Sequence, residues 1–78
     1  MDSAQLRTFI VDWLTEQLGH TVAPEANFGA LGMDSIDAVE LTDALAEKLG
    51  WDDLPVSMIL DHPSPRQLAD QLASEREK

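Results

Sequence analysis

Apolar residues recur every three or four positions in three segments of this chain, and this spacing restricts the fold to a helical bundle. In the first segment the spacing predicts a helix from Ser3 to Leu18 with one broad buried face. Asp2 can cap the start of this helix, with Gln5 as its reciprocal partner, and Gly19 can end it. The residues expected on the buried face are Leu6, Phe9, Ile10, Trp13 and Leu14.

A second helix is predicted from Ser35 to Leu49, with Asp34 as its N-cap and Gly50 after its last residue. At 100° per residue, its apolar residues fall on two faces. The face expected to be core consists of Ala38, Leu41, Leu45 and Leu49. A second, exposed stripe consists of Ile36, Val39 and Ala46 and is interrupted by Asp43.

The last helix is indicated by Ser64 as its cap, by Pro65 at its first position and by Gln67 as the partner that completes a capping box. A short helical segment is expected before it, at residues 55–60, and residues 74–78, four of which are charged, are expected to fray. The residues of the last helix that should face inward are Leu68, Ala69 and Leu72.

A long connection, residues 20–33, joins the first two helices. Several helix-breaking residues exclude regular structure there, but Val22, Phe28 and Leu31 can attach the segment to the core. We therefore expect an ordered loop that holds Ser35 in place. The complete prediction is an all-α bundle of three main helices and one short helix, in one domain over residues 1–78.

The chain is strongly acidic: it has 15 acidic and 5 basic residues among 78, a net charge of −10. Nucleic acids and anionic membrane surfaces repel such a chain, so we expect neither as a partner, and basic protein surfaces are favoured instead. No segment is long and apolar enough to span a bilayer, and the expected location is the cytoplasm. Because cysteine is absent, disulfides and thiolate metal sites are excluded.

Ser35 is the main candidate for chemistry. It is predicted at a helix start, where unpaired backbone N–H groups favour an anion. A hydrolase serine in an elbow motif has glycines two residues away on both sides, and here Met33 and Asp37 occupy those positions. His20 and His62 are expected in loops rather than beside the serine. The serine is therefore interpreted as an attachment point, with a small serine hydrolase as an alternative.

An apolar strip bordered by acids is predicted next to Ser35. Ile36 and Val39 form the strip, and such a pattern is typical of a docking surface. The acids Asp34, Asp37 and Glu40 are spaced by three residues, unlike the alternating ligands of a calcium loop, so no dedicated metal site is predicted. The acids expected to border the strip are Asp37, Glu40, Asp43 and Glu47.

The segment Gly32-Met33-Asp34-Ser35-Ile36, followed by Val39-Glu40-Leu41, resembles the modification motif of acyl carrier proteins. In that family a Gly-X-Asp-Ser-Leu/Ile segment opens the second helix, and its serine carries a 4′-phosphopantetheine arm. The resemblance extends to the loop from Phe28 to Gly32 and to the segment Asp61-His62-Pro63-Ser64-Pro65. It implies that Ser35 carries the arm and that Asp34 belongs to the flanking motif.

The subtype also follows from resemblance. The Asp-His-Pro-Ser-Pro segment looks like that of carrier domains of polyketide synthases, whereas dedicated fatty-acid carriers usually lack it. Peptidyl carriers typically have Gly-Gly where this chain has Gly32-Met33, and fatty-acid carriers commonly have an apolar residue at the position of Asp43. The resemblance implies an acyl carrier of polyketide or related secondary metabolism, with a fatty-acid or peptidyl carrier as the alternatives.

By the same resemblance the protein is a carrier and not an enzyme. A phosphopantetheinyl transferase would move the arm from coenzyme A to Ser35. An acyltransferase or ligase would then load an acyl group as a thioester, and a ketosynthase or another acyl-processing enzyme would use it. The protein is expected to be a monomer; its short ends suit a free-standing protein and equally a domain of a synthase. An unmodified helical interaction module is the alternative from a different functional class.

Overall fold

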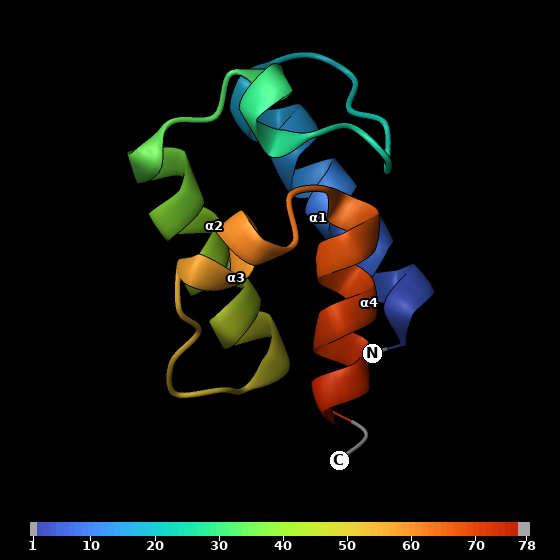
Figure 1. The fold of residues 1–78 in the computed structure, drawn as a ribbon, viewed down its shortest axis with the longest axis vertical. Helices are drawn as coiled ribbons and strands as arrows, with labels where there is room; N and C mark the ends of the chain where they lie inside the picture. Colours follow the sequence, from blue (N-terminus) through green and yellow to red (C-terminus); the bar gives the residue numbers. More distant parts are fainter. Residues whose placement is uncertain (1, 77–78) are drawn as a thin grey trace.

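Four α-helices and one short 3-10 helix form the fold in this computed structural model, which describes residues 2–76. In chain order they are α1 (Ser3–Leu18), η1 (Phe28–Leu31), α2 (Ser35–Leu49), α3 (Ser57–Asp61) and α4 (Pro65–Arg76). Figure 1 shows α2 and α4 on the two sides of the bundle, with α3 between them. Residues 2–76 contain no strand, and the all-α prediction is confirmed.

Helix α1 has the predicted bounds and the predicted cap. The Asp2 carboxylate accepts a hydrogen bond from the backbone N–H of Gln5 at 2.8 Å, and the Gln5 side chain accepts one from the backbone N–H of Asp2 at 3.0 Å. The helix packs mainly against α4 and more lightly against α2. Its fully buried residues are Leu6, Ile10 and Leu14, while Phe9 and Trp13 are partly buried against the same core.

Helix α2 also has its predicted bounds, but its buried face is wider than predicted. Leu41 and Leu45 are fully buried, as expected. Ala46, which was placed on the exposed stripe, instead packs against the core, and that assignment is wrong. Thr42 is buried as well, because its hydroxyl donates a 2.8 Å hydrogen bond to the Val39 carbonyl oxygen and so needs no water. A pattern of residue types counts threonine as polar and misses this.

The connection between α1 and α2 is ordered, as predicted. Val22 and Phe28 are buried, and Leu31 is half-buried against the core. Two backbone hydrogen bonds tie the connection to the start of α4. The Phe28 N–H donates to the Pro63 carbonyl at 2.7 Å, and the Arg66 N–H donates to the Pro24 carbonyl at 2.9 Å. Helix η1 was not predicted, since a four-residue helix is too short to show periodicity.

Helix α3 begins at Ser57, two residues later than predicted, and ends at Asp61. Pro55 and Val56 instead form the turn that precedes it. Their carbonyl oxygens accept 3.0 Å hydrogen bonds from the backbone N–H groups of Met58 and Ile59, respectively. No helix among residues 2–76 is long and apolar enough to cross a membrane.

Helix α4 starts at Pro65 as predicted, but its capping box is incomplete. Ser64 Oγ accepts a bond from the Gln67 N–H at 3.3 Å. The Gln67 side chain accepts from the Ser64 hydroxyl, not from its backbone N–H. The helix continues through Arg76, so the predicted fraying is wrong for residues 74–76, and residues 77–78 lie outside the described part. Its inward residues Leu68, Ala69 and Leu72 are fully buried, as predicted.

Candidate functional site

Ser35 is the first residue of α2, and its side chain is exposed. The turn before it depends on Gly32, which has a φ of +85° and closes η1 through a 3.4 Å bond to the Gly29 carbonyl. An L-residue at this φ costs about 1–2 kcal/mol, although a Cβ here would meet no atom within 4 Å beyond Gly32 and its two chain neighbours. Glycine at this position therefore serves the backbone turn that presents Ser35.

The first turn of α2 is held by a complete capping box. The Asp34 carboxylate accepts from the Asp37 N–H at 2.9 Å, and Asp37 Oδ2 accepts from the Asp34 N–H at 3.5 Å. Within residues 2–76, no acceptor bonds the backbone N–H groups of Ser35 and Ile36. These two donors and the positive end of the helix dipole lie beside the Ser35 hydroxyl, an arrangement that fits a phosphodiester on that oxygen.

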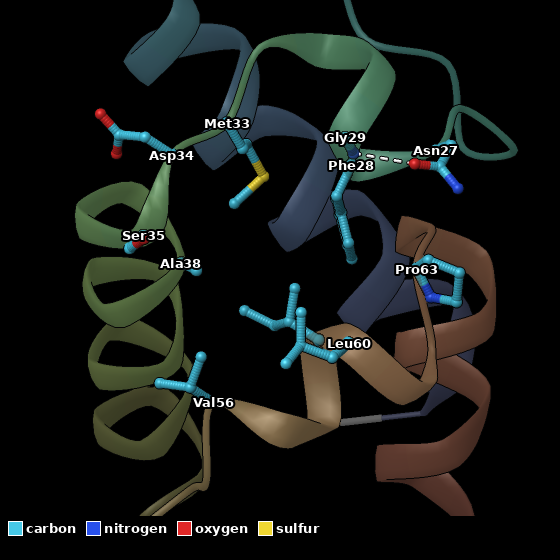
Figure 2. Close-up of a pocket in the computed structure, with 11 residues that line it drawn as sticks. Asn27, Phe28, Gly29, Met33, Asp34, Ser35, Ala38, Val56, Leu60 and Pro63 are labelled. Carbon is cyan, nitrogen blue, oxygen red and sulfur yellow. Dashed lines mark hydrogen bonds between the residues drawn. The ribbon is translucent and has the colours of Figure 1, made fainter.

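A cleft of about 550 Å³ opens next to Ser35, between η1, the start of α2 and α3. Figure 2 shows the side chains of Met33, Phe28 and Leu60 directed into it, whereas the Asp34 carboxylate turns away. The wall is mostly apolar, so the cleft can shelter an apolar chain better than a charged one. The lining residues are Asn27, Phe28, Gly29, Met33, Asp34, Ser35, Ala38, Val56, Ile59, Leu60 and Pro63.

A nucleophilic serine needs a base beside it, and the two histidines are the first candidates in this chain. Neither histidine lines the cleft, and the ring of His20 lies 3.2 Å from the Thr21 carbonyl oxygen. Across residues 2–76, the Ser35 hydroxyl has no hydrogen-bonded base, which a nucleophilic serine requires. The same residues hold no cluster of three or more histidines and acids that could bind a metal ion.

The predicted apolar strip lies on the surface, and α3 adds an exposed apolar residue that was not predicted. Ile36 is 68% exposed and Val39 is 45% exposed. Leu60 of α3 is 74% exposed and lines the cleft together with Ser35 and Ala38 of α2, so the cleft has an exposed apolar side chain on its α3 side as well. A five-residue helix gives too little periodicity to predict that Ile59 is buried and Leu60 is not.

The acids of α2 fall into two groups. Asp43 and Glu47 are exposed and make no side-chain hydrogen bond or ion pair within residues 2–76. Asp37 and Glu40 both accept hydrogen bonds from the side chain of Gln17, near the end of α1. Nothing in the sequence indicates this contact, because Gln17 lies 20 and 23 residues away from them.

Comparison with known proteins decides the family. Residues 2–72 match the family described as the phosphopantetheine attachment site. The chain belongs to this family. The carrier domain therefore has the fold and the type of covalent cofactor that the acyl carrier resemblance implied.

The curated relatives of the carrier domain are large synthases. It is 44% identical over 59 residues to the spectinabilin polyketide synthase system protein NorA′ of Streptomyces orinoci, covering 70% of this chain and 2% of that protein. It is 34% identical to the polyketide synthase GfsA of Streptomyces halstedii, covering 96% of this chain and 1% of that protein. The chain thus spans only a few hundredths of the length of these relatives.

Two solved structures share the fold of the carrier domain. One is BlmI, a type-II acyl carrier protein from Streptomyces verticillus involved in bleomycin biosynthesis; its TM-score is 0.87 at 25% identity, with 95% of this chain and 89% of that chain covered. The other is a free-standing peptidyl carrier protein from Acinetobacter baumannii; its TM-score is 0.88 at 24% identity, with 96% of each chain covered.

Proposed function

We propose that Ser35 is the attachment point of the 4′-phosphopantetheine arm and that the domain carries acyl intermediates of polyketide or related secondary metabolism. The observation that supports this is the exposed Ser35 hydroxyl at the start of a capped helix, with two open N–H donors and an apolar cleft beside it. The polyketide synthase relatives support the pathway class.

The residues of this chain hold and present the arm. Asp34 and Asp37 fix the first turn of α2, so the N–H groups of Ser35 and Ile36 can bond the phosphate oxygens. An exposed site of this kind stabilises the charge by about 0.3–1 kcal/mol. The arm supplies a terminal thiol that holds the acyl group as a thioester. Phe28, Met33 and Leu60 offer apolar surface on which a tethered apolar group loses contact with water.

The domain acts as a carrier and not as an enzyme, because chemistry at the thioester is left to its partners. These partners are a phosphopantetheinyl transferase, an acyltransferase or ligase, and a ketosynthase or other acyl-processing enzyme. The apolar residues Ile36, Val39 and Leu60 provide contact area, and the acids of α2 attract basic partner surfaces. We call these three residues and the acids Asp37, Glu40, Asp43 and Glu47 the docking surface.

Intact mass after incubation with a transferase and coenzyme A tests the attachment site. Loading forms one Oγ–P bond on the serine, breaks the pyrophosphate linkage of coenzyme A and releases adenosine 3′,5′-bisphosphate, while the hydroxyl proton passes to a base of the transferase. The natural chain should gain the mass of one arm. Ser35→Ala should gain none and should keep its helix content, because Asp34 still caps α2.

Ser3→Ala is the matched control. Ser3 is the first residue of α1 and follows a capping aspartate in a complete capping box, as Ser35 does. The hollow next to it differs from the cleft beside Ser35, because it is lined mostly by polar residues: Asp2, Ala4, Gln5, Thr8 and Lys48. We expect Ser3→Ala to load like the natural chain. A Ser35→Ala protein that still gains one arm contradicts the assignment, and a natural chain that never loads favours the unmodified interaction module. The mass of the protein isolated with its cargo identifies the acyl class.

A further inference from the structure

Gln17 connects α1 to the acids that lie beside Ser35. Its Nε2 donates a 2.9 Å hydrogen bond to Glu40 Oε2 and a 3.3 Å hydrogen bond to Asp37 Oδ1. A primary amide has two N–H donors on one nitrogen, so a single Gln17 side chain can bond both carboxylates at once. The two acids are therefore held in one arrangement by a residue on a different helix.

The Gln17 amide is neutral, and this matters for the attraction of a basic partner. Gln17 carries no charge, so it holds the side chains of both acids without placing a positive charge beside them. A lysine or arginine at this place would also bond the carboxylates, but it would cancel part of the charge that attracts a basic partner. Asp43 and Glu47, further along α2, have no such contact within residues 2–76.

Holding a side chain before binding changes the free energy of association. A flexible glutamate loses rotamer freedom when a partner fixes it, and this loss weakens binding. Asp37 already has both carboxylate oxygens bonded within the chain, one to the Gln17 amide and one to the Asp34 N–H. With Gln17 in place, Glu40 is also restricted before any partner arrives.

We propose that Gln17 is a positioning residue for transfer of the arm to Ser35: it holds Glu40 and Asp37 in place beside the serine without neutralising them. A transferase with basic side chains then meets two carboxylates that are already arranged. This inference rests on the proposed function, because it assigns Gln17 a role in the recognition that precedes loading of Ser35.

Steady-state kinetics of loading, with this protein as the varied substrate of a transferase and with coenzyme A in excess, test the proposal. Gln17→Ala should raise the KM for the carrier by roughly three- to tenfold, the size expected from one side chain that must now be ordered on binding. The kcat should stay within about twofold, since the Ser35 hydroxyl and its helix start are unchanged. Gln17→Lys should raise KM as well, although it restores a bond to the acids.

Gln71→Ala is the matched control. Gln71 also donates its side-chain amide to a glutamate, Glu75 at 3.3 Å, but it lies on α4 and does not line the cleft beside Ser35. Gln71→Ala should leave the KM for the carrier unchanged. The proposal is overturned by a Gln17→Ala protein whose KM stays within twofold of the natural value. It is also overturned by a Gln17→Lys protein that loads like the natural chain, because a charged side chain that bonds the acids would then serve as well as the neutral amide. Failure of the proposed function is a different result, because then the natural chain itself does not load.

Discussion

The backbone N–H of Phe28 donates a 2.7 Å hydrogen bond to the carbonyl oxygen of Pro63, which joins the loop before Ser35 to the start of α4. In turn, the loop supplies a hydrogen-bond acceptor to the first turn of α4, because the Arg66 N–H donates to the Pro24 carbonyl. Ser64 satisfies the next two N–H groups through its side chain and its carbonyl, and Pro65 has no N–H to satisfy. The loop and α4 therefore depend on each other.

Phe28 itself should contribute strongly to stability. It is only 4% exposed and lines the cleft, so Phe28→Ala leaves a cavity and should cost about 3–5 kcal/mol of the free energy of unfolding. The total free energy of unfolding of a domain of this size is only a little larger than that. Urea unfolding followed by circular dichroism measures the loss. Phe28→Leu, which keeps much of the volume, should cost clearly less. A loss below about 1 kcal/mol for Phe28→Ala would show that the Phe28 ring is not closely packed in the core.

Replacing Gly32 should impose backbone strain and disturb loading. Gly32→Ala should cost about 1–2 kcal/mol, because its φ is +85°. Gly19→Ala is the control: Gly19 has a φ of +77°, and a Cβ there also meets nothing within 4 Å. Both variants should lose similar stability in urea, but only Gly32→Ala should slow loading, because only Gly32 sets the turn into Ser35. Equal loading rates for the two variants would show that this turn does not orient the serine.

The helices could be predicted because their signals are local. The bounds of α1 and α2 follow from Asp2 and Asp34 at one end and from Gly19 and Gly50 at the other, all within one turn of the helix they limit. The position of Ser35 at the start of α2 follows from the same signals. Caps and periodicity act over a few residues, so a single sequence contains them.

The parts that could not be predicted depend on contacts between distant segments. The Gln17 amide finds its acids across more than 20 residues, and no spacing rule connects them. Ala46 was placed on the wrong face because alanine suits either environment. The exposure of Leu60 depends on how a five-residue helix is rotated, which its neighbours in space decide and its own sequence does not.

Clustered charge should limit the stability of the domain. The net charge is −10, and eight acids lie between Asp34 and Asp61 with Lys48 as the one base among them. Salt screens repulsion between such charges over about 10 Å at ~0.1 M. The melting temperature should therefore rise with added sodium chloride and with millimolar magnesium. A melting temperature that does not change with ionic strength would mean that this repulsion adds no significant cost to folding.

The apolar part of the docking surface should matter for transfer and not for folding. Ile36 and Leu60 are 68% and 74% exposed, so replacing either with alanine removes little buried area and should leave the melting temperature nearly unchanged. Each change should slow transfer of the arm or of an acyl group by several-fold, because buried apolar anchors supply much of the binding energy at an interface. If Leu60→Ala transfers like the natural chain while Ile36→Ala does not, the docking surface ends on α2.

Charge reversal on α2 should slow partner association mainly at low salt. Exposed acids at the edge of an interface act chiefly on the association rate, and salt screens that effect. Asp43→Lys gives the cleaner measurement, because Asp43 makes no side-chain bond within residues 2–76, whereas Glu40→Lys also disturbs the contact with Gln17.

Asp70→Lys on α4 is the control, with the same change of charge at an exposed position on another helix. Loading rates across a salt series should fall for Glu40→Lys and Asp43→Lys at low salt, converge toward the natural rate at high salt, and change little for Asp70→Lys. If Asp43→Lys matches the natural chain at every salt concentration while Glu40→Lys does not, then Asp43 lies outside the docking surface, and the acids that guide the partner are those closest to Ser35.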